Sequence, residues 1–157
     1  MAISDLEIII SAFSNYLMFD VANQSDFSAC NQALLGFDKP YIPNEYAEFL
    51  SLISNGFSLD GMWLFGTIEQ ENNQNNHVYF IPSLITIAEQ FSDFSFVEKY
   101  LFIGQFFGLM IAYNYETDGY EIINTQTFQT VDNYKMFEDM FYALIMKRTE
   151  NENIENT

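Results

Sequence analysis

Residues 100–123, YLFIGQFFGLMIAYNYETDGYEII, decide the fold class of this chain. They contain three apolar runs of strand length, at 100–105, 109–115 and 120–123. A short Phe-Gly turn separates the first two runs, and Asp118-Gly119, a pair typical of β-hairpins, precedes the third. Strands joined by hairpins pair antiparallel, because a parallel pair needs a longer crossover connection. The stretch therefore predicts an antiparallel meander within an α+β fold, and not a doubly wound α/β fold.

Helices are predicted on both sides of this meander. Ser4 and Glu7 have the spacing of a capping box, and Pro43 suits the first position of a helix that ends at Asn55-Gly56. Apolar residues recur at helical spacing after each of these starts. The predicted helices cover about 5–19, 43–55, 82–91 and 133–147.

The other segments are predicted to be short strands and polar loops. The strands lie at 62–65, 78–81 and 128–132, and the loops at 20–41, with one helical turn around 31–35, and at 69–77. We expect a single domain over residues 1–157, with a core from about 5 to 148 and a disordered acidic tail over 149–157. Its sheet should be mixed but largely antiparallel, with about five to six strands and about four helices packed against it.

Charge is the most unusual property of the composition. The chain has 22 Asp and Glu against 5 Lys and Arg, which gives a net charge of −17. Few carboxylates can be buried without a partner, so the folded surface must be broadly negative. Such a surface repels nucleic acid and anionic membranes, and it attracts basic partners. We therefore expect a basic protein partner, no nucleic acid and no membrane.

The only cysteine, Cys30, excludes an intramolecular disulfide and favours a reducing compartment. The first residues lack the positive region and the cleavage site of a signal peptide. The apolar run 101–115 is too short to cross a bilayer. These features predict a cytoplasmic protein, and they leave the oligomeric state open.

Groups that could carry catalysis are scarce. His77 is the only histidine and lies in a predicted loop, so a His-activated nucleophile or a zinc site is disfavoured. No phosphate-binding glycine motif occurs. The carboxylates at 116, 118 and 121, or at 69 and 71, could bind calcium or act as a hydrolase pair, but no EF-hand pattern is present. We expect no enzyme activity, no cofactor and no metal, with a carboxylate-based hydrolase or small-ligand binder as an alternative.

A series of short motifs resembles the SUKH superfamily of Smi/Knr-like proteins. The segments IPNEYAEFL at 42–50 and SNGF at 54–57 are similar to the family's helix-and-turn signature. They are followed in family order by the strand GMWLFG at 61–66, a helix, and a strand ending in Ile103-Gly104. The resemblance covers about 41–146, and the acidic and aromatic character is most similar to the YrhA-type branch. It implies an α+β fold and no carried-over active site.

The resemblance also implies a function. Many bacterial members are immunity proteins that bind and neutralise a toxin domain, often a nuclease, and fungal relatives act through protein contacts. We therefore expect an immunity-type protein that neutralises a bacterial toxin through its acidic surface. A cytosolic adaptor or regulatory domain is the alternative. Tyrosine is enriched as an interface anchor, and half-exposed tyrosines are expected around the hairpin. The candidate partner-binding residues therefore include a tyrosine as well as acidic residues. They are Glu69, Glu71, Glu116, Asp118, Tyr120 and Glu121.

Overall fold

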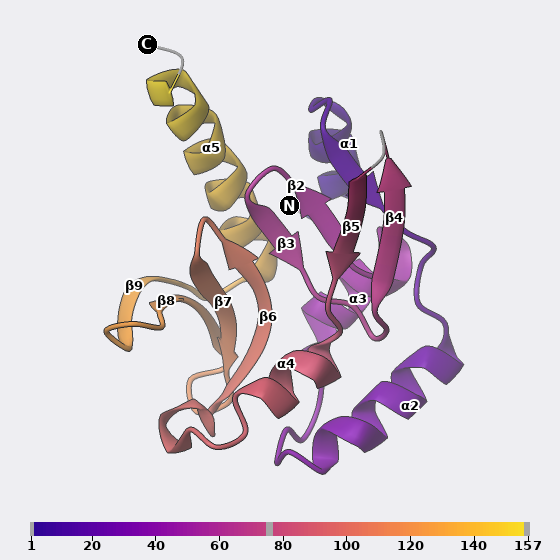
Figure 1. Cartoon of the computed structure of the whole chain (residues 1–157), viewed down its shortest axis with the longest axis vertical. Coiled ribbons are helices and arrows are strands. Elements are labelled where there is room, and N and C mark those ends of the chain that lie inside the picture. Colours follow the sequence, from indigo (N-terminus) through magenta and orange to yellow (C-terminus); the bar gives the residue numbers. More distant parts are fainter. Residues whose placement is uncertain (1, 75–76, 156–157) are drawn as a thin grey trace.

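The computed structural model describes residues 2–74 and 77–155, and it describes side chains for 2–72 and 80–147. Figure 1 shows the arrangement of helices and strands. The helices are α1 (Asp5–Ser11), α2 (Gln24–Leu35), α3 (Asn44–Leu52), α4 (Leu84–Gln90) and α5 (Phe137–Glu155), with a 3₁₀ turn at Ser95–Val97. The strands are β1 (Tyr16–Met18), β2 (Phe57–Leu59), β3 (Met62–Leu64), β4 (Gln70–Gln74), β5 (His77–Ile81), β6 (Tyr100–Phe106), β7 (Leu109–Asn114), β8 (Gly119–Asn124) and β9 (Gln129–Tyr134).

The sheet confirms the α+β class and the predicted meander. Seven strands pair antiparallel in the order β1-β2-β3-β6-β7-β8-β9, and β4 and β5 form a separate two-stranded sheet. The expected five to six strands and four helices are therefore slightly too few. All pairings between the described strands are antiparallel, so the expectation of a mixed sheet is wrong; the parallel bridge between Gly66 and Ser83 lies outside the named strands.

Aromatic rings bind two helices to the sheet. Phe49 of α3 lies 5.4 Å from Phe137 and 5.6 Å from Phe141 of α5, measured between ring centroids, and 6.0 Å from Phe57 of β2. All four side chains are fully buried. Tyr46 of α3 is also buried, and its hydroxyl donates to the carbonyl oxygens of Phe65 and Ile103. The motif at 42–50 thus fixes α3 against both α5 and the centre of the sheet.

The N-terminal third differs from the prediction. Helix α1 ends at Ser11, and the segment predicted as its second half forms β1, whose residues pair with β2. Ser4 makes no side-chain cap bond. The predicted loop 20–41 contains the twelve-residue α2. Asn23 and Asp26 form a reciprocal capping box there, with bonds of 2.9 and 2.8 Å. Hydrophobic periodicity does not predict this helix, because most of its residues are polar and only Cys30 and Leu34 are buried.

Three further predictions are corrected. The segment 69–77 is not a loop, because 70–74 form β4 in register with β5, and this register places His77 in a strand. Strand β2 follows the left-handed Gly56 (φ 99°), which is a turn residue and not the cap of α3. The last helix begins at Phe137 and not near 133, because β9 occupies 129–134 as an edge strand.

Helix α5 reaches Glu155, so it runs through most of the segment predicted as a disordered tail. The last two residues of that segment are outside the described part of the chain. In the described part, no helix has both the length and the apolar character that a bilayer span requires.

Candidate functional site

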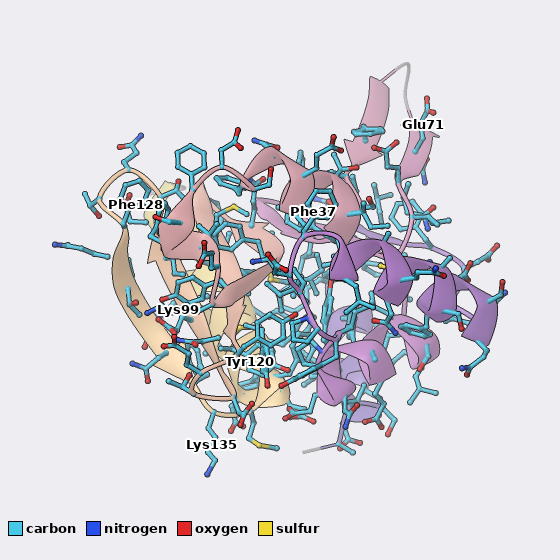
Figure 2. All side chains as sticks on the ribbon, turned by 90° about the horizontal axis from the view of Figure 1, so that it is seen from below. Phe37, Glu71, Lys99, Tyr120, Phe128 and Lys135 are labelled. Carbon is cyan, nitrogen blue, oxygen red and sulfur yellow. The ribbon has the colours of Figure 1, made fainter. Side chains whose placement is uncertain are left out.

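The six predicted partner-binding residues lie in two separate places. Glu116, Asp118, Tyr120 and Glu121 belong to the β7–β8 hairpin, whereas Glu69 precedes β4 and Glu71 lies within it. In Figure 2, Glu71 lies at the upper right of the molecule and Tyr120 lies in its lower middle part, well apart from it. Glu69 and Glu71 are exposed, and the Glu69 carboxylate accepts a bond of 3.0 Å from the Thr86 hydroxyl. The structure therefore does not assemble all six residues into one surface.

The hairpin residues differ strongly in exposure. Glu116 and Asp118 are exposed, but the Tyr120 side chain is only 1% exposed. The expectation of half-exposed tyrosines is therefore wrong for Tyr120 and for the buried Tyr113, whereas Tyr115 is half-buried as expected. Alternation along β8 explains the burial of Tyr120, because Tyr120 faces the core next to Phe137. Glu121 is half-buried and accepts bonds from three groups, the Tyr100 hydroxyl, the Asn114 amide and the Thr130 hydroxyl, at 3.1, 2.6 and 2.7 Å.

A hollow of about 490 Å³ opens beside this hairpin. Three parts of the chain build it: the segment before α3 with the first turn of α3, the end of β7, and the turn into β8. We call it the tyrosine–carboxylate hollow. Its lining residues are Tyr41, Pro43, Asn44, Glu45, Tyr113, Asp118 and Tyr120.

Tyrosine hydroxyl groups hold the Asp118 carboxylate in place. Its Oδ1 atom accepts a bond of 2.8 Å from the Tyr113 hydroxyl and a longer one of 3.4 Å from the Tyr41 hydroxyl. The Tyr115 hydroxyl donates to the Tyr41 carbonyl oxygen at 2.7 Å, and the rings of these two residues meet edge to face at 5.1 Å. Asp118 has a left-handed backbone (φ 55°), which the tight turn imposes. Burial, followed by the hydrogen bonds with Tyr41 and Asp118, raises the pKa of Tyr113, so its hydroxyl stays protonated and donates to Asp118.

Glu45, the second carboxyl group that lines the hollow, has the carboxyl group of Glu138 as a neighbour. Glu45, on the first turn of α3, accepts the backbone N–H of Phe137 at 2.8 Å and thereby caps α5. Glu138, the next residue of α5, is only 7% exposed, and its Oε2 atom has no hydrogen-bond partner among the described residues. Burial and the neighbouring Glu138 carboxyl raise the pKa of Glu45, although the Phe137 N–H opposes this shift.

Positive charge is scarce around the hollow. None of its lining residues is Lys or Arg. Within 2–72 and 80–147, where side chains are described, the only ion pair joins Lys147 to Asp132 at 2.8 Å, and Lys39 is buried. Lys99 lies over the Tyr100 ring at 5.2 Å, and Lys135 points outward (Figure 2). The carboxylates of Asp118 and Glu45 therefore face the hollow without a cation from these residues.

The hollow has the chemistry of a cation site for an organic side chain. Two carboxylates can accept the N–H groups of a guanidinium or ammonium, and tyrosine faces attract the same cations. A metal ion is a poorer fit, because no group of three or more His, Cys, Asp or Glu suited to a metal occurs among the described residues. Tyr41 is 43% exposed, so an incoming side chain can reach its ring.

The sequence did not reveal two lining residues of this hollow, or the carboxyl group that lies beside one of them. Glu45 lies in the motif at 42–50 and Tyr41 directly precedes it, and the family resemblance assigns this segment only a role in the fold. Glu138 gave no signal in the sequence, because it meets Glu45 only after α3 and α5 have packed together.

No protein-family model matches the chain, and no curated protein matches it.

Proposed function

We propose that this chain is a protein-binding, immunity-type protein that neutralises a cognate bacterial toxin through its acidic surface. The tyrosine–carboxylate hollow is the proposed point of contact, and it takes an arginine or lysine side chain of the toxin. One observation carries the proposal: Asp118 and Glu45 face a tyrosine-walled hollow whose lining contains no cationic residue. The SUKH resemblance supplies the expectation of a toxin, and the charge supplies the expectation of a basic partner.

The physical basis of recognition is charge complementarity at two ranges. A net charge of −17 accelerates the encounter with a basic protein, and salt screens this long-range attraction. At contact, Asp118 is already oriented by Tyr113, so little side-chain freedom is lost when a cation pairs with it. Arginine fits better than lysine, because its planar group can pair with a carboxylate while it stacks on the exposed Tyr41 ring.

Active-site clefts of nucleases are positively charged because they bind phosphates. An acidic protein that inserts into such a cleft competes directly with the nucleic acid. Neutralisation would then need no catalysis by this chain. This supports a nuclease as the toxin class, in agreement with the proposed SUKH relationship.

The test is co-expression with the toxin encoded by the adjacent gene, followed by isolation of the complex by gel filtration. Wild-type protein should protect the cells and co-elute with the toxin. Asp118→Asn keeps the size of the side chain and its bond from Tyr113 but removes the charge, so it should weaken the complex about tenfold. Asp20→Asn is the matched control, because it makes the same charge change at an exposed aspartate outside the hollow.

Three outcomes would overturn the proposal. Without protection and without a complex, the immunity function fails. If the wild type protects the cells and Asp118→Asn and Asp20→Asn weaken this protection equally, the hollow is not the contact point. Only the overall charge would then matter for binding. Capture of a cellular protein without any protection would instead favour an adaptor.

A further inference from the structure

A second, smaller cavity lies on another part of the molecule and does not belong to the hollow. It has a volume of about 150 Å³ and is enclosed by the end of α2, by α4, by the turn that follows α4, and by β6. We call it the phenylalanine pocket. Its lining residues are Gly36, Phe37, Asp38, Lys39, Ala88, Phe91, Ser92, Phe94, Val97, Glu98, Tyr100, Leu101 and Phe102.

Aromatic rings form the walls of this pocket. Phe91 meets Phe102 edge to face at 5.0 Å and lies 6.0 Å from Phe94, measured between ring centroids. Phe94 remains 46% exposed, so the pocket is open to a molecule that arrives from solvent. A cavity of about this volume is large enough to hold one benzene ring. The walls and the volume together favour a single aromatic ring as the occupant.

One of the lining residues is a buried lysine. Lys39 is only 6% exposed, and its Nζ atom donates to the carbonyl oxygens of Val97 and Glu98 at 2.9 and 3.2 Å. An ammonium group has three N–H donors, so one donor is left after these two bonds. No described carboxylate lies within ion-pair distance of it. Burial lowers the pKa of Lys39, while Asp38 and Glu98 raise it in part. An acceptor atom brought by a ligand would complete its bonding.

We infer that the phenylalanine pocket binds one neutral phenolic ring. The ring packs among Phe91, Phe94 and Phe102, and the phenolic oxygen accepts the third N–H of Lys39. A neutral oxygen is favoured over a carboxylate, because the exposed Asp38 and Glu98 carboxylates at the pocket repel an anion. This inference does not rest on the proposed toxin binding, since it concerns a different cavity and requires no partner.

The test compares three probes of nearly equal shape on the full chain by NMR titration: p-cresol, toluene and p-toluate. A hydrogen bond to a charged donor should make p-cresol bind about tenfold more tightly than toluene. p-Toluate should bind more weakly than p-cresol. Toluene binding as tightly as p-cresol would overturn the role of Lys39, and no saturable binding by either neutral probe would overturn the pocket.

Two variants separate ligand recognition from folding. Lys39→Met retains an unbranched side chain of similar length without the ammonium, so the preference for p-cresol over toluene should disappear. Because Lys39 also binds two backbone carbonyls, this variant could fail to fold. Ala88→Leu leaves Lys39 intact and fills the pocket from α4, so binding of every probe should be lost. Probe binding that survives Ala88→Leu would show that the rings bind elsewhere.

The phenolic ring could be a free small molecule or a tyrosine of a partner protein. Two blocked tripeptides, Lys-Tyr-Lys and Glu-Tyr-Glu, distinguish these sources. Tighter binding of Lys-Tyr-Lys than of p-cresol indicates a partner tyrosine flanked by basic residues, which Asp38 and Glu98 would attract. Binding of p-cresol with exclusion of both peptides indicates a free phenolic compound. Exclusion of p-cresol together with both peptides would contradict the inference, whatever the outcome of the toxin experiment.

Discussion

Replacing Glu45 by glutamine should stabilise this protein at neutral pH. The Glu45 carboxylate lies beside the buried Glu138, whose Oε2 atom has no partner among the described residues. In Glu45→Gln the amide oxygen can still accept the Phe137 N–H, which is bonded at 2.8 Å in the wild type. The amide NH₂ can then donate to the Glu138 carboxylate. One change therefore removes a like-charge contact and gives a buried oxygen a donor.

The size of the gain follows from opposing effects. A hydrogen bond to a charged group contributes about 1.5–3 kcal/mol. Glu45 also carries negative charge at the N-terminal ends of α3 and α5, and each such contact stabilises by about 0.3–1 kcal/mol. Subtracting both helix contributions leaves a net gain on the order of 1 kcal/mol. For a chain of this size the melting temperature should rise by about 2–4 °C.

The pH dependence gives the sharper test. The pKa of Glu45 is raised above its ordinary value of 4.5, so the folded chain binds this proton more tightly than the unfolded chain. Folding stability should therefore fall as pH rises from the unfolded-state pKa through the raised value. In Glu45→Gln this loss is absent, so the gain should be present at pH 7 and nearly gone at pH 4. Asp132 acts in the opposite sense, because its pKa is lowered, mainly by Lys147. Its contribution to folding stability is therefore lost as pH falls.

Urea denaturation at pH 4 and pH 7 measures both effects. Glu48→Gln on the same helix is the matched control, because Glu48 is exposed and should change stability by less than about 0.5 kcal/mol at either pH. In a Glu138→Gln background the gain from Glu45→Gln should shrink, since no charged oxygen remains to accept the amide. A loss of stability at pH 7, or an equal gain at both pH values, would refute the reasoning.

Three further predictions concern the core and the net charge. Tyr46→Phe should destabilise by about 1–2 kcal/mol in urea denaturation because two carbonyl oxygens lose a buried donor, whereas the exposed Tyr142→Phe should have little effect. Gly104→Ala should abolish or severely weaken folding, because the new Cβ would lie 2.3 Å from the Trp63 carbonyl oxygen. Gly36→Ala is the control and should fold, since the nearest contact of its Cβ is at 3.3 Å; circular dichroism measures both outcomes. The melting temperature should rise with moderate salt, which screens self-repulsion at a net charge of −17, and a flat response would contradict this.

The parts of the fold that the sequence predicted well are those with strong local signals. The meander 100–123 combines long apolar runs with a hairpin pair, and all three of its strands are present. Where local and long-range signals compete, the prediction failed. The helical spacing of apolar residues predicted that the first helix continues to residue 19. Tyr16–Met18 instead pair with β2, which lies about forty residues later in the chain. Helix α2 was missed for the opposite reason, since its capping box lies in a polar segment with little periodicity.

The candidate site was predictable only in part. Asp118, Tyr113, Tyr115 and Tyr120 belong to one hairpin, so sequence proximity is enough to group them, whereas Tyr41 comes from the segment before α3. The sequence alone does not fix the pleat of β8, and the pairing Tyr113↔Tyr120 determines that Tyr120 faces the core. Glu45 and Glu138 are 93 residues apart and meet only through packing of α3 on α5. No pattern within the sequence brings such a pair together.

The Glu45–Glu138 pair has a consequence that links stability to binding. If Glu45 faces an incoming cation, its charge is unfavourable in the free protein and useful in the complex. Glu45→Gln should then raise the melting temperature and, in the same preparation, weaken the proposed complex with a toxin encoded by the adjacent gene by about three- to tenfold. Asp118→Asn should weaken the complex without the gain in stability, because Asp118 is exposed and adjoins no buried carboxyl. If Glu45→Gln is stabilised but binds the toxin as tightly as the wild type, Glu45 does not contact the partner, and recognition in the hollow is reduced to Asp118 and the tyrosine faces.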